Sequence, residues 1–113
     1  MEVMLFATDG AATTGYGVHP SGETAVRLPY GVRIVMLRQQ TGAAGANDAN
    51  WTLWTDYKST GQRFLRVSLL PASDGGVKLG PTGIRIRPGA AIQFAWDQAV
   101  AQANTLEVYY EKM

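Results

Sequence analysis

The stretch Ala91-Ile92-Gln93-Phe94-Ala95-Trp96-Asp97 alternates large apolar side chains with small or polar ones. Successive side chains of an extended strand point to opposite faces, so Ile92, Phe94 and Trp96 share one face. A helix would instead repeat its apolar positions every three or four residues. The stretch therefore predicts a β-strand with one buried row, and with it a fold built from β-sheets.

The same two-residue period recurs between clusters of glycine, proline, asparagine and aspartate along the rest of the chain. Residues 9–22 and 41–50 are predicted to be open loops, and residues 97–103 a single short helical turn. About eight short strands at this spacing predict an all-β fold: one antiparallel two-sheet β-sandwich domain over residues 1–113, of jelly-roll or Greek-key type. A closed barrel is the main alternative. The strands are predicted near residues 2–8, 24–28, 32–39, 51–57, 63–70, 77–87 (in one or two pieces), 91–97 and 105–111.

Composition favours association over chemistry or charge-driven binding. The 113 residues suit one domain, and only 17% are charged, compared with roughly 25% in typical soluble domains. A formal net charge of +1 provides no field for holding a polyanion or an anionic membrane, so a nucleic-acid partner is disfavoured. There is no cysteine, no apolar run long enough for a membrane helix and no signal-peptide pattern. We therefore expect no disulfide, no membrane association and no export by a signal peptide.

The residues that catalysis needs are sparse. His19 is the single histidine, it precedes Pro20 in a glycine-rich segment, and it is predicted to be an exposed loop residue. Four carboxylates could form a glycosidase-type pair, but their spacing selects no pair, so they are predicted to be solvated, with Asp56 paired to a nearby lysine or arginine. They are Asp56, Asp97, Glu107 and Glu111. The chain is predicted to be no enzyme, with no metal and no cofactor.

Some strands carry aromatic or arginine side chains on the face opposite the predicted core. Trp54 faces away from Trp51, and arginines alternate with isoleucines in Ile84-Arg85-Ile86-Arg87. Tryptophan, tyrosine and arginine are favoured in protein interfaces, and the chain has seven arginines against three lysines. A subunit contact is therefore preferred over a ligand platform. The predicted contact or platform residues are Tyr16, Tyr30, Trp54, Arg85, Arg87 and Tyr109.

The stretch from Ile84 to Phe94, followed by Leu106-Glu107-Val108-Tyr109-Tyr110, resembles the closing strands of small jelly-roll proteins in bacterial virus particles. The resemblance covers the last third of the chain, and its motif is an apolar strand, Pro-Gly, a second apolar strand and Leu-x-Val-x-Tyr. It implies a capsid, capsid-decorating or tail-associated subunit that forms a homo-oligomer and contacts other virion proteins. The expected location is then the virion, and otherwise the cytoplasm.

Two other functions stay open. A carbohydrate-binding β-sandwich would stack sugar rings on Trp54 together with Tyr109 or Tyr57. A barrel that binds single-stranded nucleic acid would combine aromatic residues with arginines, but it usually carries a larger positive charge than this chain has. An enzyme ranks last.

Overall fold

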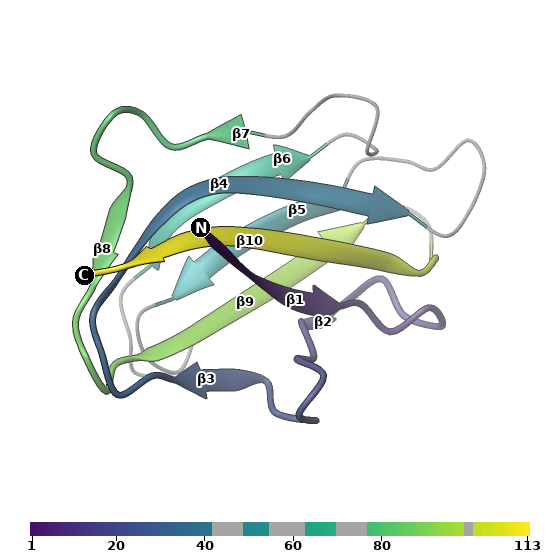
Figure 1. Ribbon diagram of the computed structural model, residues 1–113. Coiled ribbons are helices and arrows are strands. Elements are labelled where there is room, and N and C mark those ends of the chain that lie inside the picture. Colours follow the sequence, from purple (N-terminus) through teal and green to yellow (C-terminus); the bar gives the residue numbers. More distant parts are fainter. Residues whose placement is uncertain (42–48, 55–62, 70–76, 99–100) are drawn as a thin grey trace.

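The structure, a computed structural model, describes residues 1–41, 49–54, 63–69, 77–98 and 101–113, with the backbone alone for 41, 49 and 63–69. All pairings between its strands are antiparallel, and the strands form two facing sheets (Figure 1). The all-β two-sheet sandwich predicted from the sequence is confirmed. The strands are β1 (Glu2–Ala7), β2 (Thr14–Tyr16), β3 (Ala25–Arg27), β4 (Val32–Thr41), β5 (Ala49–Trp54), β6 (Arg63–Leu69), β7 (Val77–Lys78), β8 (Ile84–Ile86), β9 (Ala91–Gln98) and β10 (Asn104–Lys112).

The order of the strands is that of a jelly roll. Sheet A has the order β1-β10-β4-β7, with β8 also paired to β4, and sheet B has the order β2-β9-β5-β6, with β3 also paired to β9. Since β2 and β3 share one neighbour, as do β7 and β8, each sheet has four strand positions. The chain crosses between the sheets after most strands, which gives the two interlocked Greek keys of a jelly roll.

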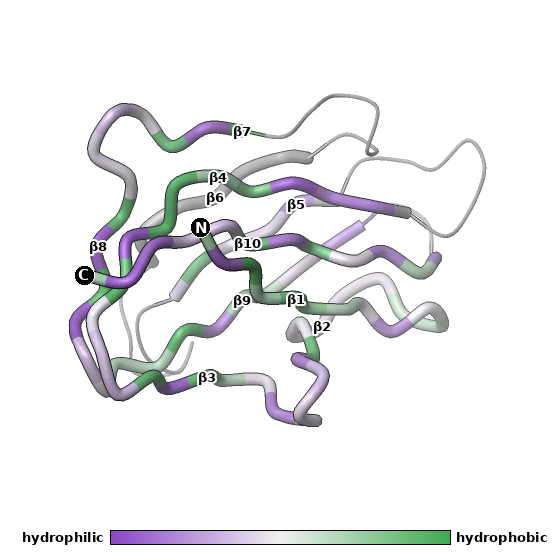
Figure 2. Tube along the Cα trace, viewed as in Figure 1, coloured by the Kyte–Doolittle hydropathy of each residue, from purple (hydrophilic) through white to green (hydrophobic). Residues whose placement is uncertain are grey.

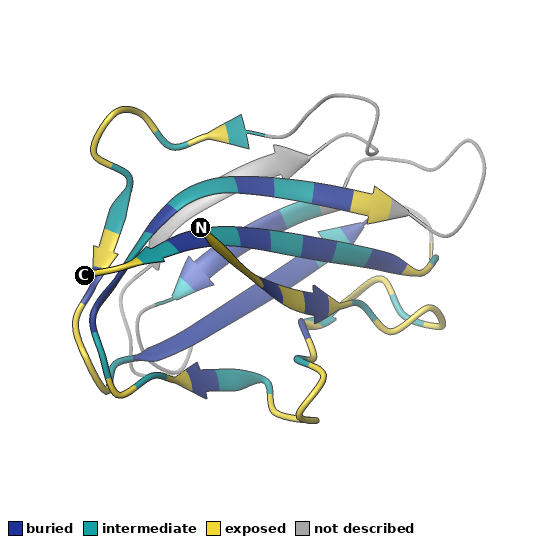
Figure 3. Cartoon of the chain, in the orientation of Figure 1, coloured by how far each residue is buried: buried dark blue, intermediate teal, exposed yellow. Residues whose placement is uncertain are grey.

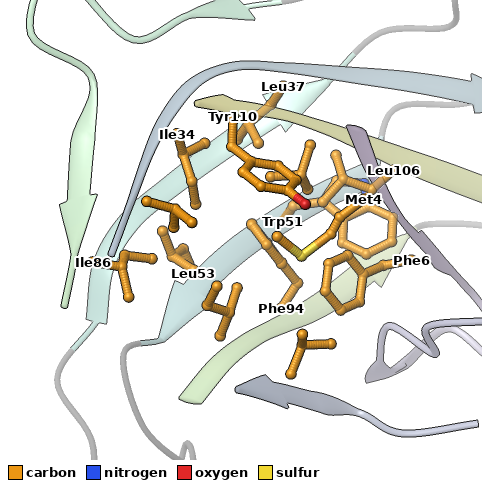
Figure 4. Close-up of a cluster of buried hydrophobic side chains, with 14 of the residues drawn as sticks. Met4, Phe6, Ile34, Leu37, Trp51, Leu53, Ile86, Phe94, Leu106 and Tyr110 are labelled. Carbon is orange, nitrogen blue, oxygen red and sulfur yellow. The ribbon is translucent and has the colours of Figure 1, made fainter. Parts of the chain in front are cut away.

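The core lies between the sheets (Figure 4), and β9 and β5 are the two central strands of sheet B. Ile92, Phe94 and Trp96 on β9 are buried as predicted, but the opposite row of Ala91, Gln93 and Ala95 is buried as well, so the prediction of a single buried row is wrong in part. Trp51 on β5 lies opposite Trp96 in the register and is fully buried. Sheet A contributes the apolar rows of its own strands, which are Met4, Phe6, Val32, Ile34, Leu37, Ile86, Leu106, Val108 and Tyr110.

The predicted loop over residues 9–22 is wrong in part, because it contains β2. Gly15 and Gly17 suggested irregular structure, yet Gly15 lies within β2 and Gly17 directly after it, and both pack against aromatic side chains. A Cβ at Gly15 would lie 3.0 Å from the Trp96 ring, and one at Gly17 would lie 2.8 Å from Phe6. Large rings thus occupy the space that side chains would need. The glycines allow the strand to pass over the core instead of breaking it.

The predicted helical turn over residues 97–103 is also wrong. Strand β9 continues through Gln98, and residues 101–103 are not helical, whereas 99–100 lie outside the described residues. The Gln98 side chain is buried and donates to the carbonyl oxygens of Ala12 at 3.1 Å and Gln102 at 3.0 Å. It accepts a 2.6 Å hydrogen bond from Asn104 Nδ2. This buried network ties the end of β9 to the start of β10 and to the segment before β2.

Candidate functional site

The three described candidate carboxylates are bound by neighbouring side chains on the sheets. Asp97 accepts a 2.8 Å hydrogen bond from Asn50, and Glu111 pairs with Arg33. Glu107 accepts from Gln40 at 2.7 Å. No group of three or more histidine, cysteine, aspartate or glutamate side chains that could hold a metal occurs in the described ranges. Glu111 is thus ion-paired and Asp97 is bound by an amide, whereas Asp56, for which ion pairing was predicted, lies outside the described residues.

His19 is more constrained than the sequence indicated. It is half-buried, its ring meets the edge of Phe6 with centroids 5.8 Å apart, and its Nδ1 lies 3.0 Å from Ser21 Oγ. Its backbone N–H donates to Glu23 and its carbonyl accepts from Gly22. The prediction that His19 is an exposed loop residue is therefore wrong: its ring packs against the core and its backbone hydrogen bonds close a turn.

Strand β1 is the edge of sheet A, and much of this edge is open. It pairs with β10 along its whole length, from Glu2 opposite Tyr110 to Ala7 opposite Thr105. On its other side, the one described partner is Val18, which bridges to Ala7. A long open edge presents unpaired backbone groups to any strand that can approach it.

The side chains of β1 make this edge apolar on both faces. Met4 and Phe6 point into the core, whereas Val3 and Leu5 point outward and are 49% and 38% exposed (Figure 3). Val18, beside the end of the strand, is 41% exposed. Figure 2 shows the strand as hydrophobic along most of its length. The sequence signal was available, because Val3-Met4-Leu5-Phe6-Ala7 contains no polar residue, but the pattern predicts only a strand near residues 2–8 and not its place at the edge of a sheet.

The other described edges of sheet A and sheet B are protected in the usual ways. Strands β2, β3, β7 and β8 have three residues or fewer, and Arg27, Lys78 and Arg85 are exposed on three of them. Short strands and charged side chains both discourage pairing with another chain. Strand β6 is longer, but only its backbone is described. Among the edges whose side chains are described, β1 alone is long, apolar and uncharged along its centre.

A polar network covers the centre of the outer face of sheet A, beside β1. Glu107 lies opposite Leu5 in the register and accepts a 2.9 Å hydrogen bond from the Tyr109 hydroxyl. Arg38 approaches Glu107 at 3.8 Å. The hydrogen bond to Glu107, together with burial, raises the pKa of Tyr109. Charges in the middle of the sheet are therefore matched within the chain, and the apolar strip lies at its rim.

The structure does not gather the six predicted contact residues into one surface. Tyr16 and Trp54 belong to the outer face of sheet B, as their register partners Ala95 and Gln93 show. The others are elsewhere. Arg85 and Tyr109 lie on the outer face of sheet A. Arg87 is exposed just after β8. Tyr30 precedes β4, and the Lys112 ammonium lies 4.6 Å from the centroid of its ring.

This placement corrects one proposed sugar platform. Trp54 and Tyr109 lie on opposite outer faces of the sandwich, so they cannot stack on one ligand. Tyr57, the other suggested partner, lies outside the described residues. Tyr16 is the described aromatic that shares a face with Trp54, and it is 41% exposed. Trp54 is half-buried, and its Nε1 has no hydrogen-bond partner in the described structure.

Comparison with known proteins gave no relatives: no protein-family model, curated protein or solved structure matches this chain. In the described residues, no helix is long and apolar enough to cross a membrane.

Proposed function

We propose that this chain is a non-enzymatic structural subunit that acts by associating with copies of itself, as subunits of virus particles do. The observation that carries the proposal is the open β1 edge, where Val3 and Leu5 are exposed and no charged side chain protects the centre of the strand. Natural proteins usually protect such an edge, since it promotes association. An unprotected edge is expected in a protein whose function is to bind other protein subunits.

Two further observations support this function. Jelly rolls are common in viral capsid proteins and also occur in lectins. The resemblance of residues 84–94 and 106–110 to small virion proteins suggests the same class and adds a capsid, decoration or tail role. The low charged fraction of 17% also lowers the cost of burying surface between subunits.

Light scattering coupled to size-exclusion chromatography tests the association. The chain has a mass of 12.2 kDa, and the expected result is a weight-average mass that rises well above this value as the concentration increases. A constant 12.2 kDa over the whole range up to millimolar concentration would overturn the proposal. The virion role has a separate test, because the gene should then lie among capsid or tail genes.

Carbohydrate binding is the second candidate, and the outer face of sheet B is the observation in its favour. Tyr16 and Trp54 flank β9 on this face, and the neighbouring Asn50 and Asp97 side chains are joined by a hydrogen bond. Sugar sites combine an aromatic platform with such polar groups. A glycan array should then give hits that Trp54→Ala and Tyr16→Ala both remove, and no hits would exclude this function.

A further inference from the structure

Along β1, the backbone N–H and C=O groups of every second residue point away from β10. Ala7 N–H donates to Val18 O and Val18 N–H donates to Ala7 O, both at 2.9 Å, on the side of β1 that faces away from β10. The register with β10 is unbroken from residue 2 to residue 7. Bonding direction alternates along an antiparallel strand, so the N–H and C=O groups of Val3 and Leu5 also point to the open side. No described residue pairs with them there.

We propose that a second copy of this chain occupies this edge, with the two β1 strands antiparallel about a twofold axis at Met4. This inference rests on the proposed function and names the surface and the partner. Val3 exchanges backbone hydrogen bonds with the partner's Leu5, and Leu5 does so with the partner's Val3. The two five-stranded A sheets then continue into each other.

The register follows from which backbone groups are available. Only outward-pointing residues can exchange both of their hydrogen bonds with a new neighbour, and on the open part of β1 these are Val3 and Leu5. Ala7 is already closed by Val18, which blocks any pairing centred farther along the strand. Centring the pair on Met4 satisfies all four free groups of Val3 and Leu5 in each copy. A twofold arrangement therefore uses the edge completely.

The charges favour a second copy in this orientation. Glu2 is the only charged residue of β1, and its carboxylate lies 3.8 Å from Lys112 Nζ. A parallel neighbour would place two Glu2 side chains next to each other, whereas the antiparallel pair puts them at opposite ends. On the outer face, Val3 and Leu5 of both copies then form one uninterrupted apolar row. Like charges are kept apart and apolar surface is covered by apolar surface.

The area available sets the strength of the contact. Covering two partly exposed side chains and the strand edge removes a few hundred Å² per copy, compared with roughly 800 Å² per partner in a standard interface. The isolated pair is therefore weak and dependent on concentration. Many such contacts in a multi-subunit assembly would add through high effective concentration, as a structural subunit requires.

Disulfide cross-linking tests the register directly, because the chain has no cysteine of its own. Val3→Cys and Leu5→Cys are made separately, one of them carrying a mass tag, and are oxidised alone and as an equal mixture. Hydrogen-bonded antiparallel pairs have Cα atoms about 5.5 Å apart, within the range a disulfide spans. The expected result is a mixed disulfide that forms several-fold more than either symmetric product.

Val18→Cys is the matched control, because Val18 is exposed to a similar degree but lies beyond the proposed pairing. It should give little product with either β1 variant. If light scattering shows association while the Val3–Leu5 product does not exceed the Val18 products, the β1 pairing is overturned and the proposed function stands. A symmetric Val3 disulfide that dominates would also overturn this register. A strictly monomeric chain overturns both.

Discussion

Trp51 Nε1 donates a 2.8 Å hydrogen bond to Gln39 Oε1, and this bond joins the two sheets through the buried interior. Trp51 belongs to β5 in sheet B and Gln39 to β4 in sheet A, and neither is more than 1% exposed. A buried indole N–H needs a partner, and a glutamine on the opposite sheet supplies it. The polar pair thus fixes how the two sheets face each other.

Gln39→Leu should lower the free energy of unfolding by about 1–3 kcal/mol, because the Trp51 N–H then stays buried without its acceptor. Tryptophan fluorescence and circular dichroism during chemical denaturation measure the change. Gln40→Leu is the control, since Gln40 is the exposed neighbour and its amide binds Glu107 on the surface. Equal stability of the two variants would contradict the structural role assigned to the buried pair.

Gly83→Ala should be much more destabilising than Gly80→Ala, although both glycines have positive φ values, +64° and +71°. A left-handed conformation alone costs an alanine about 1–2 kcal/mol. At Gly83 the added Cβ would also lie 2.5 Å from the carbonyl oxygen of Ile34 on β4, whereas at Gly80 it meets nothing within 4 Å. Urea denaturation of the two variants should therefore differ by at least about 1 kcal/mol, and similar values would show that β8 does not approach β4 this closely.

The sequence predicted most of the fold because the strands are amphipathic and the core is apolar. Alternation placed Trp51 inside, Trp54 outside and the Arg85 side chain at the surface, and the structure agrees. Strand β2 was missed because Gly15 and Gly17 have no side chain to show a period. Gly15 is required by the Trp96 ring and Gly17 by Phe6 and the Trp51 ring, which lie on other strands, and the local sequence pattern does not reveal these contacts.

The candidate site was harder to predict than the fold. Single-residue preferences selected aromatic and arginine side chains such as Tyr30 and Arg87, which the structure distributes over several surfaces. The β1 edge depends on strand order, since Val3 and Leu5 matter only because no described strand pairs with Glu2–Phe6 on the side away from β10. Strand order arises from long-range pairing, and periodicity within a segment says nothing about it.

The free energy of unfolding should fall between about pH 10 and pH 12, and deprotonation of Tyr110 should contribute to this fall. Burial, followed by the hydrogen bond with Tyr30, raises the pKa of Tyr110 to about 12. Because the folded chain holds the phenol proton more tightly than the unfolded chain, this stabilisation is complete below pH 10 and is lost as the pH rises toward 12. Tyr110→Phe should flatten that part of the curve in denaturation measured at several pH values. An unchanged slope in the variant would contradict the assignment.

Hydrogen exchange should reveal the open edge without any substitution. The N–H groups of Met4 and Phe6 point toward β10, whereas those of Val3 and Leu5 point away from it, so protection should alternate along the strand in dilute solution. As the concentration rises and β1 pairs with a second copy, Val3 and Leu5 should become slower while Met4 and Phe6 change little. Amide exchange followed by nuclear magnetic resonance at two concentrations measures both effects. Protection of Val3 and Leu5 that is already high in the dilute monomer would show that this edge is closed within the chain, and it would remove the surface on which the assembly function depends.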